Sequence, residues 1–325
     1  MCDDYIVPSH LQKGGLMKKV SALAVLALFS LTFTFSAAAA GNQYVHRQIS
    51  PIVSTDWLSA HQSDANLLII DGRTAEEYAA GHIANSSNVP VDRWWVTKGS
   101  LLLELPDQED LRDLIGICGI TKNTKVVLVN KIDTDFDRAQ ATRVAFTLAY
   151  GGVVNVAILN GGINKWIAEE RPTTTEPFEP SVVNYTGVFN ERIAVSKSYV
   201  SYYLKFPYQA RIVDTRVTED FFGVAPLSFS TKAGHIPRAL CLPTPWVFTA
   251  DGCFREAEDL EAMAKGVMGA DTYKRTILYC GVGGYASTWW FILSEVLGYY
   301  KVRVYEGSMQ EWTEDPAAPV IKYSW

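Results

Sequence analysis

Residues 276–285 read Thr-Ile-Leu-Tyr-Cys-Gly-Val-Gly-Gly-Tyr, which is a short apolar run followed by one cysteine and a glycine-rich turn. The run 276–279 has the length and the β-branched content of a buried strand. A helical pattern follows over residues 286–297. The stretch therefore predicts a strand, a tight loop and a helix, with Cys280 directly after the strand.

The two halves of the chain repeat one another block by block. Five blocks recur in the same order at separations of roughly 140 to 155 residues, which exceed the period of a solenoid repeat. The blocks pair 69–73 with 212–216, 80–83 with 233–236, 89–90 with 242–243, 126–130 with 276–280, and 160–166 with 306–312. We interpret the chain as two homologous domains in tandem.

Each half alternates strand and helix patterns. Buried strands are expected at 67–70, 126–129, 154–158, 211–213, 276–279 and 302–305, and helices at 108–118, 138–150, 256–267 and 286–297. This alternation predicts an α/β fold in which each domain has a parallel sheet flanked by helices on both faces. The Pro- and Thr-rich stretch predicts a linker at 171–189 between domains at 41–170 and 190–325.

The composition limits the possible partners. The chain has 325 residues, of which 48% are hydrophobic, and a formal net charge of −6. This length suits two domains of ordinary size. The sequence contains no basic patch of the kind that neutralises phosphates, so nucleic acid is not expected as a partner.

The N-terminal residues have the pattern of a secretory signal peptide. Lys18-Lys19 precede an apolar run over 20–35, and the small residues 36–40 follow. This order predicts a signal peptide within 1–40 that is cleaved after Ala40, with an uncleaved anchor as the alternative. Residues 1–16 match no targeting element, which favours Met17 as the start. We expect a periplasmic or secreted protein, with no stable membrane span after cleavage.

Export changes the interpretation of the cysteines, because an oxidising compartment permits disulfides. Cys118, Cys241, Cys253 and Cys280 follow the predicted cleavage site, with no CxxC pair and no metal-ligand spacing. Cys241 and Cys253 are candidates for a disulfide, and two buried thiols are the alternative. We expect no metal or organic cofactor, and a monomer.

Cys280 is the candidate nucleophile. Ligands of open α/β sheets bind beyond the carboxyl ends of the strands, where this residue is predicted to lie. The loop 281–285 can turn backbone N–H groups inward, and the next helix presents its positive end. Because both features stabilise a thiolate, we expect an easily ionised, reactive thiol.

Two other cysteine chemistries fit less well. A phosphatase loop needs an arginine six residues after the cysteine to clamp phosphate, and Ala286 occupies that position. A cysteine hydrolase needs a histidine beside the thiol. The second half offers only His235, and its counterpart His82 lies in the half without a matching cysteine. We therefore interpret both histidines as structural.

Taken together, these features resemble the tandem-domain rhodaneses, the thiosulfate and 3-mercaptopyruvate sulfurtransferases. The resemblance rests on the Cys280 loop and on three motifs that each occur twice: D-x-R at 71–73 and 214–216, G-H-I at 81–83 and 234–236, and G-x-x-x-x-W at 161–166 and 307–312. It implies two rhodanese-like domains, each with a five-stranded parallel sheet, and an active site in the cleft between them.

The resemblance also implies a mechanism. Cys280 takes a sulfane sulfur from a small anionic donor and passes it from a persulfide to a thiol or cyanide acceptor. The N–H groups of Gly281, Val282, Gly283, Gly284 and Tyr285 would hold the anionic persulfide. Arg216 matches the position of the family's substrate-binding arginine; a salt bridge is its alternative role.

The sequence departs from the family pattern in both halves. Asn130 occupies the cysteine position of the first half, followed by Asp133, Asp135 and Asp137, so that half is expected to be catalytically silent. The Cys280 loop contains no Lys or Arg, whereas thiosulfate-preferring relatives have basic residues there. Glu219-Asp220 stand where mercaptopyruvate enzymes have a second arginine. The donor, thiosulfate or 3-mercaptopyruvate, is left open.

Three functions remain at this point. The first is catalytic sulfur transfer, and the second is a carrier that loads sulfur or selenium on Cys280 without fast turnover. The third is a rhodanese-like structural or sensory module that forms no persulfide. Multiple turnover with free small acceptors separates the first from the second, and persulfide formation separates both from the third.

Overall fold

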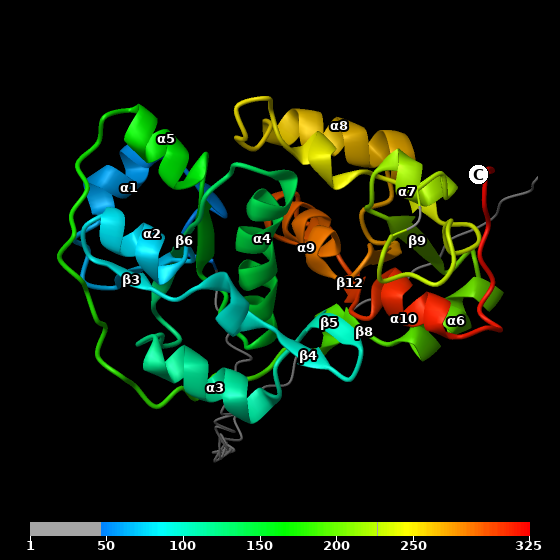
Figure 1. Ribbon diagram of the computed structural model, residues 1–325, viewed down its shortest axis with the longest axis horizontal. Helices are drawn as coiled ribbons and strands as arrows, with labels where there is room; N and C mark the ends of the chain where they lie inside the picture. Colours follow the sequence, from blue (N-terminus) through cyan, green and yellow to red (C-terminus); the bar gives the residue numbers. More distant parts are fainter. Residues whose placement is uncertain (1–46, 226) are drawn as a thin grey trace, which may run out of the picture. The chain divides into compact units, whose positions relative to one another are not determined.

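The computed structural model describes residues 47–225 and 227–325 of the chain. The signal peptide predicted within 1–40, its cleavage after Ala40 and the start at Met17 lie outside the described residues. Two five-stranded parallel sheets dominate the fold (Figure 1). This confirms the predicted α/β class and the pair of rhodanese-like sheets.

The two sheets have the same strand order. The first has the order β1-β7-β6-β2-β3 and the second has the order β8-β12-β11-β9-β10. The first is built from β1 (Ile52–Val53), β2 (Leu67–Asp71), β3 (Ser86–Asn88), β6 (Lys125–Val129) and β7 (Val156–Leu159). The second is built from β8 (Ala194–Val195), β9 (Ala210–Asp214), β10 (Leu240–Cys241), β11 (Arg275–Tyr279) and β12 (Val302–Tyr305). In each sheet, the central strand is the one that leads into the Asn130 or Cys280 loop.

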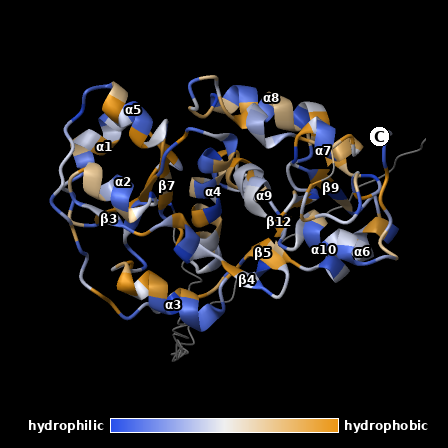
Figure 2. Cartoon of the chain, in the orientation of Figure 1, coloured by the Kyte–Doolittle hydropathy of each residue, from blue (hydrophilic) through white to orange (hydrophobic). Residues whose placement is uncertain are grey.

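Buried apolar side chains explain why these runs form central strands. Val126 to Val129 and Thr276 to Tyr279 are buried, as expected for parallel strands covered on both faces. The register places Ile69 beside Val127 in the first sheet and Ile212 beside Ile277 in the second. In Figure 2, strands β7 and β9 are coloured hydrophobic, whereas α3 (Gln108–Ile117) alternates between the two colours.

Helices connect the strands. The first half contains α1 (Thr55–His61), α2 (Ala75–Ala80), η1 (Val91–Trp94), α3, α4 (Asp135–Tyr150) and α5 (Gly162–Ala168). The second contains η2 (Glu191–Ile193), α6 (Lys197–Lys205), α7 (Thr218–Phe222), η3 (Thr244–Val247), α8 (Ala257–Met268), α9 (Gly284–Trp290) and α10 (Ser308–Glu314). None of these described helices has both the length and the apolar character needed to cross a bilayer.

Two helix boundaries differ from the sequence prediction for local reasons. Helix α4 begins at Asp135 rather than at 138, because Thr134 and Asp137 form a capping box around its first turn. The helix expected at 286–297 begins at Gly284 and continues after Trp290 as a π-helical turn, η4 (Phe291–Val296). Hydrophobic periodicity does not reveal either feature.

Helices α4 and α9 pack against each other and join the two halves (Figure 1). The Thr142 and Thr288 hydroxyls are hydrogen-bonded at 2.8 Å, and the Phe146 and Trp290 rings meet edge to face with centroids 5.0 Å apart. One continuous cluster of buried apolar side chains includes both rings. The interface between the halves therefore has the character of a protein core.

A β-hairpin of the first half reaches the second half. Strands β4 (Val96–Lys98) and β5 (Leu101–Glu104) pair antiparallel. The Leu102 N–H donates to Gln310 Oε1 at 2.9 Å, and Gln310 Nε2 donates to the Ser100 carbonyl at 2.6 Å. These two bonds dock the hairpin on α10, which directly follows the loop after β12.

Replacing Phe146 by Ala should destabilise both halves together. The Phe146 ring is completely buried at their interface, so its loss should lower the free energy of unfolding by about 3–5 kcal/mol. Urea unfolding followed by Trp fluorescence measures the change. Phe206→Ala, at a 41% exposed position, should change it by less than about 0.5 kcal/mol. Equal effects of the two variants would contradict a core-like interface.

Candidate active site

Cys280 lies at the carboxyl end of the central strand β11, directly before a turn into α9. The turn closes because Gly283 adopts a left-handed conformation with φ of +86°, which glycine adopts without steric cost. This conformation lets the Gly283 N–H donate a hydrogen bond to Cys280 Sγ at 3.1 Å. The sulfur is thus held by the backbone of its own loop, and only 2% of the residue is exposed.

The turn after β12 supports the Cys280 loop from the neighbouring strand. Cys280 N–H donates to Ser308 Oγ at 3.1 Å, and the Met309 N–H donates to the Cys280 carbonyl at 3.1 Å. Ser308 has a φ of +48°, a left-handed conformation that is uncommon for a residue other than glycine. Its counterpart in the first half is Gly162, with φ of +56°. The serine at this position provides a hydroxyl to the cysteine backbone that glycine lacks.

Burial dominates the electrostatics of the thiol. Desolvation raises the pKa of Cys280 above its ordinary value, and the Asp214 carboxylate raises this pKa further. The backbone N–H groups of Ala286, Val282 and Gly283 act in the opposite direction and lower the pKa. In the structure, burial outweighs these donors. The easily ionised thiolate expected from the sequence is therefore not what this conformation favours.

Gly281 and Tyr285, at the two ends of the predicted loop, have close packing or hydrogen-bond partners. An ideal Cβ on Gly281 would come within 2.7 Å of Phe229 Cζ, so this position has no space for a side chain. The Tyr285 carbonyl accepts a hydrogen bond from Thr244 Oγ1 at 3.0 Å, which ties the start of α9 to η3. The roles of Gly281, Val282, Gly283, Gly284 and Tyr285 in substrate binding stay predictions.

Arg216 lies near the loop but is already paired. Its Nε and Nη2 donate to both Asp214 carboxylate oxygens at 2.5 to 3.1 Å, and Nη2 also donates to the Gly234 carbonyl. In the first half, Arg73 makes the corresponding bonds to Asp71 and to the Gly81 carbonyl. Both halves thus use the arginine to join the strand end to the G-H-I segment. The substrate-binding role of Arg216 stays a prediction.

Sequence reasoning missed Arg143, which reaches the Cys280 loop from helix α4 of the first half. It is 1% exposed and pairs with Glu306 through two bonds, Nη1 to Oε1 at 3.0 Å and Nη2 to Oε2 at 2.9 Å. Its Nη1 would lie 3.4 Å from a Cβ on Gly283. The signal in the sequence is one arginine within the apolar stretch of a helix, where burial requires a partner for the charge.

Comparison with known proteins agrees with this geometry. The Rhodanese-like domain matches the chain twice, over residues 54–169 and 204–315. The chain belongs to the rhodanese family. Its relatives include the sulfur carrier protein TtuD of Thermus thermophilus, at 28% identity over 86% of this chain and 98% of that protein. Another is the thiosulfate sulfurtransferase of Corynebacterium glutamicum, at 29% identity over 88% and 94%.

Solved structures of the same fold include the anaerobic ergothioneine biosynthesis enzyme of Chlorobium limicola. It aligns with a TM-score of 0.74 at 21% identity, over 85% of this chain and 71% of that chain. The low identity limits this likeness to the fold.

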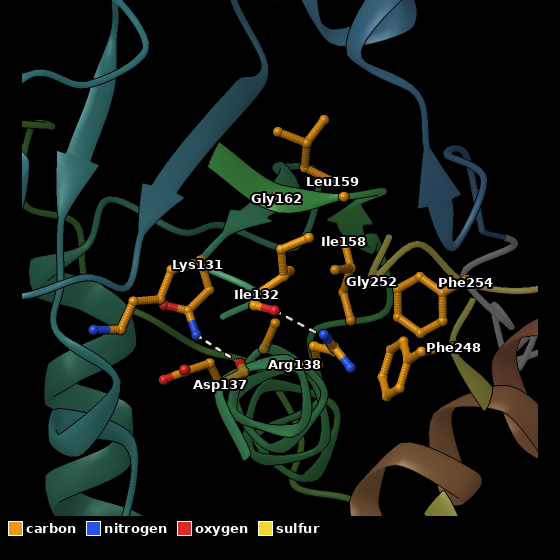
Figure 3. Close-up of a pocket in the computed structure, with 13 residues that line it drawn as sticks. Lys131, Ile132, Asp137, Arg138, Ile158, Leu159, Gly162, Phe248, Gly252 and Phe254 are labelled. Carbon is orange, nitrogen blue, oxygen red and sulfur yellow. Dashed lines mark hydrogen bonds between the residues drawn. The ribbon is translucent and has the colours of Figure 1, made fainter. Parts of the chain in front are cut away.

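The first rhodanese domain has no open site at the position that matches Cys280. Asn130 Nδ2 donates to the Asp137 carbonyl at 2.8 Å and to Gln140 Oε1 at 3.1 Å. Figure 3 shows the pocket beside this loop, into which Phe248, Gly252 and Phe254 of the second domain project. Its cavity of about 10 Å³ is no larger than one water molecule requires.

The acidic residues after Asn130 have structural partners. Asp133 accepts a hydrogen bond from Asn164, and Asp135 pairs with Arg138 at 2.7 Å. The Asp137 carboxylate accepts a hydrogen bond from the Thr134 N–H at 3.0 Å, at the start of α4. These three carboxylates therefore each stabilise the loop or the helix start.

Both histidines occupy equivalent structural positions. The His82 ring stacks on Tyr78 and is hydrogen-bonded to the Tyr78 carbonyl at 2.8 Å. His235 stacks on Phe221 and is hydrogen-bonded to the Phe221 carbonyl at 2.9 Å.

Lys232 is held by backbone carbonyls of the C-terminal segment. Lys232 Nζ donates to the carbonyls of Asp315, Pro316 and Ala318. Cys241 and Cys253 are free thiols, and Cys253 Sγ lies 3.9 Å from Lys165 Nζ.

Removing one partner of the Arg143–Glu306 pair should be more harmful than removing both charges. Arg143→Met leaves a largely buried carboxylate unpaired and should cost about 3–5 kcal/mol of stability. The double variant Arg143→Met/Glu306→Gln should recover much of that loss. Chemical denaturation of the four proteins in a double-mutant cycle measures the coupling. Additive effects would show that the pair contributes no interaction energy.

Glu104 should give the protein's stability a measurable pH dependence. Burial, followed by the nearby Glu306 charge, raises its pKa to about 7, against the opposing effect of Arg143. The unfolded chain loses this proton at lower pH than the folded protein, so stability should fall as the pH rises from about 4.5 to about 7. In Glu104→Gln this part of the slope should vanish. An unchanged profile of melting temperature against pH would show that the carboxyl titrates normally.

Proposed function

We propose that this rhodanese is a sulfurtransferase that moves a sulfane sulfur through a persulfide on Cys280. The observation that carries the proposal is the Cys280 sulfur at the end of the central strand, hydrogen-bonded to the Gly283 N–H at 3.1 Å. Backbone N–H groups at this point can donate hydrogen bonds to an anionic sulfur and so stabilise its charge. The relatives named for thiosulfate sulfurtransfer and sulfur carriage support the same chemistry.

The reaction has two halves. In the first, the Cys280 thiolate attacks the outer sulfur of thiosulfate or a similar donor, and the donor's remaining part leaves with the bonding electron pair. In the second, a thiol or cyanide attacks the terminal sulfur of the persulfide and restores the thiolate. Binding of the donor must offset the burial that raises the pKa of Cys280. 3-Mercaptopyruvate is the alternative donor in this proposal.

The first domain would be catalytically silent. It would contribute residues that border the Cys280 site. Asn130 cannot carry a transferable sulfur, and its side chain is engaged by α4. That domain nevertheless contributes Arg143 beside the Cys280 loop and the hairpin docked on α10. We also propose export, on the basis of the signal-peptide pattern at residues 18–40.

A carrier role is the second candidate. The 2% exposure of Cys280 favours it, because a buried persulfide is protected from free small acceptors. The relative named a sulfur carrier protein covers nearly the same length. In this version, Cys280 would load once and release its sulfur to one dedicated protein.

Intact-protein mass spectrometry after incubation with thiosulfate tests the proposal. The wild type should gain the mass of one sulfur atom, and Cys280→Ser should gain none, because its hydroxyl cannot form a persulfide. Cys253→Ser serves as the matched control and should load like the wild type.

Cyanide is then added to the loaded protein, and thiocyanate is measured over time. Repeated turnover supports the enzyme, and a single release supports the carrier. Absence of an adduct with thiosulfate, mercaptopyruvate and polysulfide alike would refute both candidates.

A further inference from the structure

A second cavity lies at the amino edge of the second sheet, where its strands begin. It has a volume of about 190 Å³. Its lining includes Ala210 and Leu240, the first residues of β9 and β10, and Lys274, which directly precedes β11. These three strands are neighbours in the sheet. The cavity is therefore built on the starts of adjacent parallel strands.

The cavity is separate from the Cys280 site. Strands β9 and β11 pair in register from Ala210 and Arg275 to Asp214 and Tyr279, and Cys280 follows at that far end. Four residue steps of about 3.3 Å each separate the two ends of these strands by roughly 13 Å. A ligand in this cavity would not touch Cys280, so a role for the cavity does not depend on sulfur transfer.

Three cationic side chains line the cavity, namely Arg211, Arg238 and Lys274. Among residues 47–225 and 227–325, the ion pairs of the structure include none of these three. None of the described residues that line the cavity is acidic. In a chain with a formal net charge of −6, this is a local concentration of positive charge, which attracts anions.

Arg211 supplies the buried charge of this group. It is 6% exposed, and its Nη1 donates to the Met268 carbonyl at the end of α8 at 2.6 Å, while Nε donates to Thr276 Oγ1 at 3.1 Å. Burial lowers the pKa of Arg211, and the Asp271 charge raises it in part. Asp271 itself accepts hydrogen bonds from N–H groups of its own turn. The guanidinium is thus fixed in place by neutral oxygens.

Arg238 and Lys274 supply the groups that a ligand could reach. Arg238 is exposed, and Lys274 is half-buried. Arg238 has a φ of +65°, a left-handed conformation that is uncommon for a residue other than glycine. A guanidinium can donate two parallel N–H bonds to the two oxygens of a carboxylate. The geometry therefore suits a carboxylate at the opening of the cavity.

The first domain has neutral residues at all three positions. The repeated blocks align Arg211 with Leu68, Arg238 with Asn85, and Lys274 with Thr124.

Asn85 shares the backbone conformation of Arg238, with φ of +63°. Its Nδ2 donates to the Gln62 carbonyl at 3.3 Å, just beyond α1. The same fold thus forms without the three charges, so the charges are a feature of the second domain and not a requirement of the architecture.

Apolar side chains form much of the remaining lining. Leu204, Pro207 and Leu240 contribute it from the end of α6, the segment after it and β10. A cavity of about 150 Å³ is enough to hold benzene. The space beside the cations therefore suits one ring or a short aliphatic chain.

We propose that this cavity binds a small organic carboxylate that carries one ring or a short apolar chain. The carboxylate would pair with Arg238 and Lys274, and the buried charge of Arg211 would add to the attraction. The ring or chain would lie against Leu204 and Leu240. The proposal adds a second ligand site to the domain and is independent of the chemistry at Cys280.

A ¹⁹F NMR titration with 4-fluorobenzoate tests the proposal on the purified protein. We expect saturable binding with a Kd on the order of 1 mM or lower. The neutral isostere 4-fluorobenzamide should bind about tenfold or more weakly, because it cannot pair with the cations. Acetate, which lacks the ring, should displace the probe only at about tenfold higher concentration than benzoate does.

Two substitutions copy the first domain into this site. Arg238→Asn retains a residue that adopts the left-handed conformation readily, so the variant should melt like the wild type. The double variant Arg238→Asn/Lys274→Thr should bind 4-fluorobenzoate about tenfold or more weakly. Arg192→Asn is the matched control, since Arg192 is exposed and precedes β8, at the opposite end of the sheet from β10. It should bind like the wild type.

Three results would overturn the proposal. The first is the absence of saturable binding below about 10 mM in the wild type. The second is equal affinity for the amide and the carboxylate, and the third is equal affinity of the double variant and the Arg192→Asn control. Each would leave the proposed sulfur transfer at Cys280 unaffected, because that reaction is measured separately by mass.

Discussion

The site depends on one constraint, the burial of a sulfur atom at the end of a central parallel strand. The Gly283 N–H donates a hydrogen bond to this sulfur at 3.1 Å. This bond requires the left-handed conformation of Gly283. The neighbouring turn holds the loop in place through Ser308 and Met309. Hydrogen bonds therefore join the central strand, the loop and the turn after β12 around Cys280.

The second consequence of this constraint is electrostatic. Burial raises the pKa of the thiol, and the backbone donors lower it, so the two effects oppose each other. The arginines that approach the loop are each paired with a carboxylate. The groups that stabilise negative charge on the sulfur itself are backbone N–H groups, whose dipoles act most strongly where water is excluded.

The two halves share one fold but contribute differently to the Cys280 site. Both central strands lead through a loop into a helix, and both D-x-R arginines make the same bonds. In the first half, Asn130 is engaged by α4, and residues of the second domain fill the space beside it. Arg143, Leu103 and Phe136 of that half lie beside Gly283 and Gly284, at the start of α9.

The sequence alone determined the α/β class, the duplication and the position of Cys280 between a strand and a helix. These features follow from local periodicity, glycine placement and the order of the repeated blocks, all of which are present in the chain itself. Local reasoning also placed the glycine-rich turn after Cys280, although the helix begins at Gly284 rather than at 286.

Only the tertiary structure decided what surrounds the sulfur. Arg143, Leu103 and Phe136 lie more than a hundred residues from Cys280, and they reach its loop because α4 packs on α9 and the hairpin docks on α10. The 2% exposure of Cys280 likewise depends on neighbours that sequence spacing does not specify. Burial is a property of the packed chain, and burial sets both the pKa of the thiol and the polarity of its surroundings.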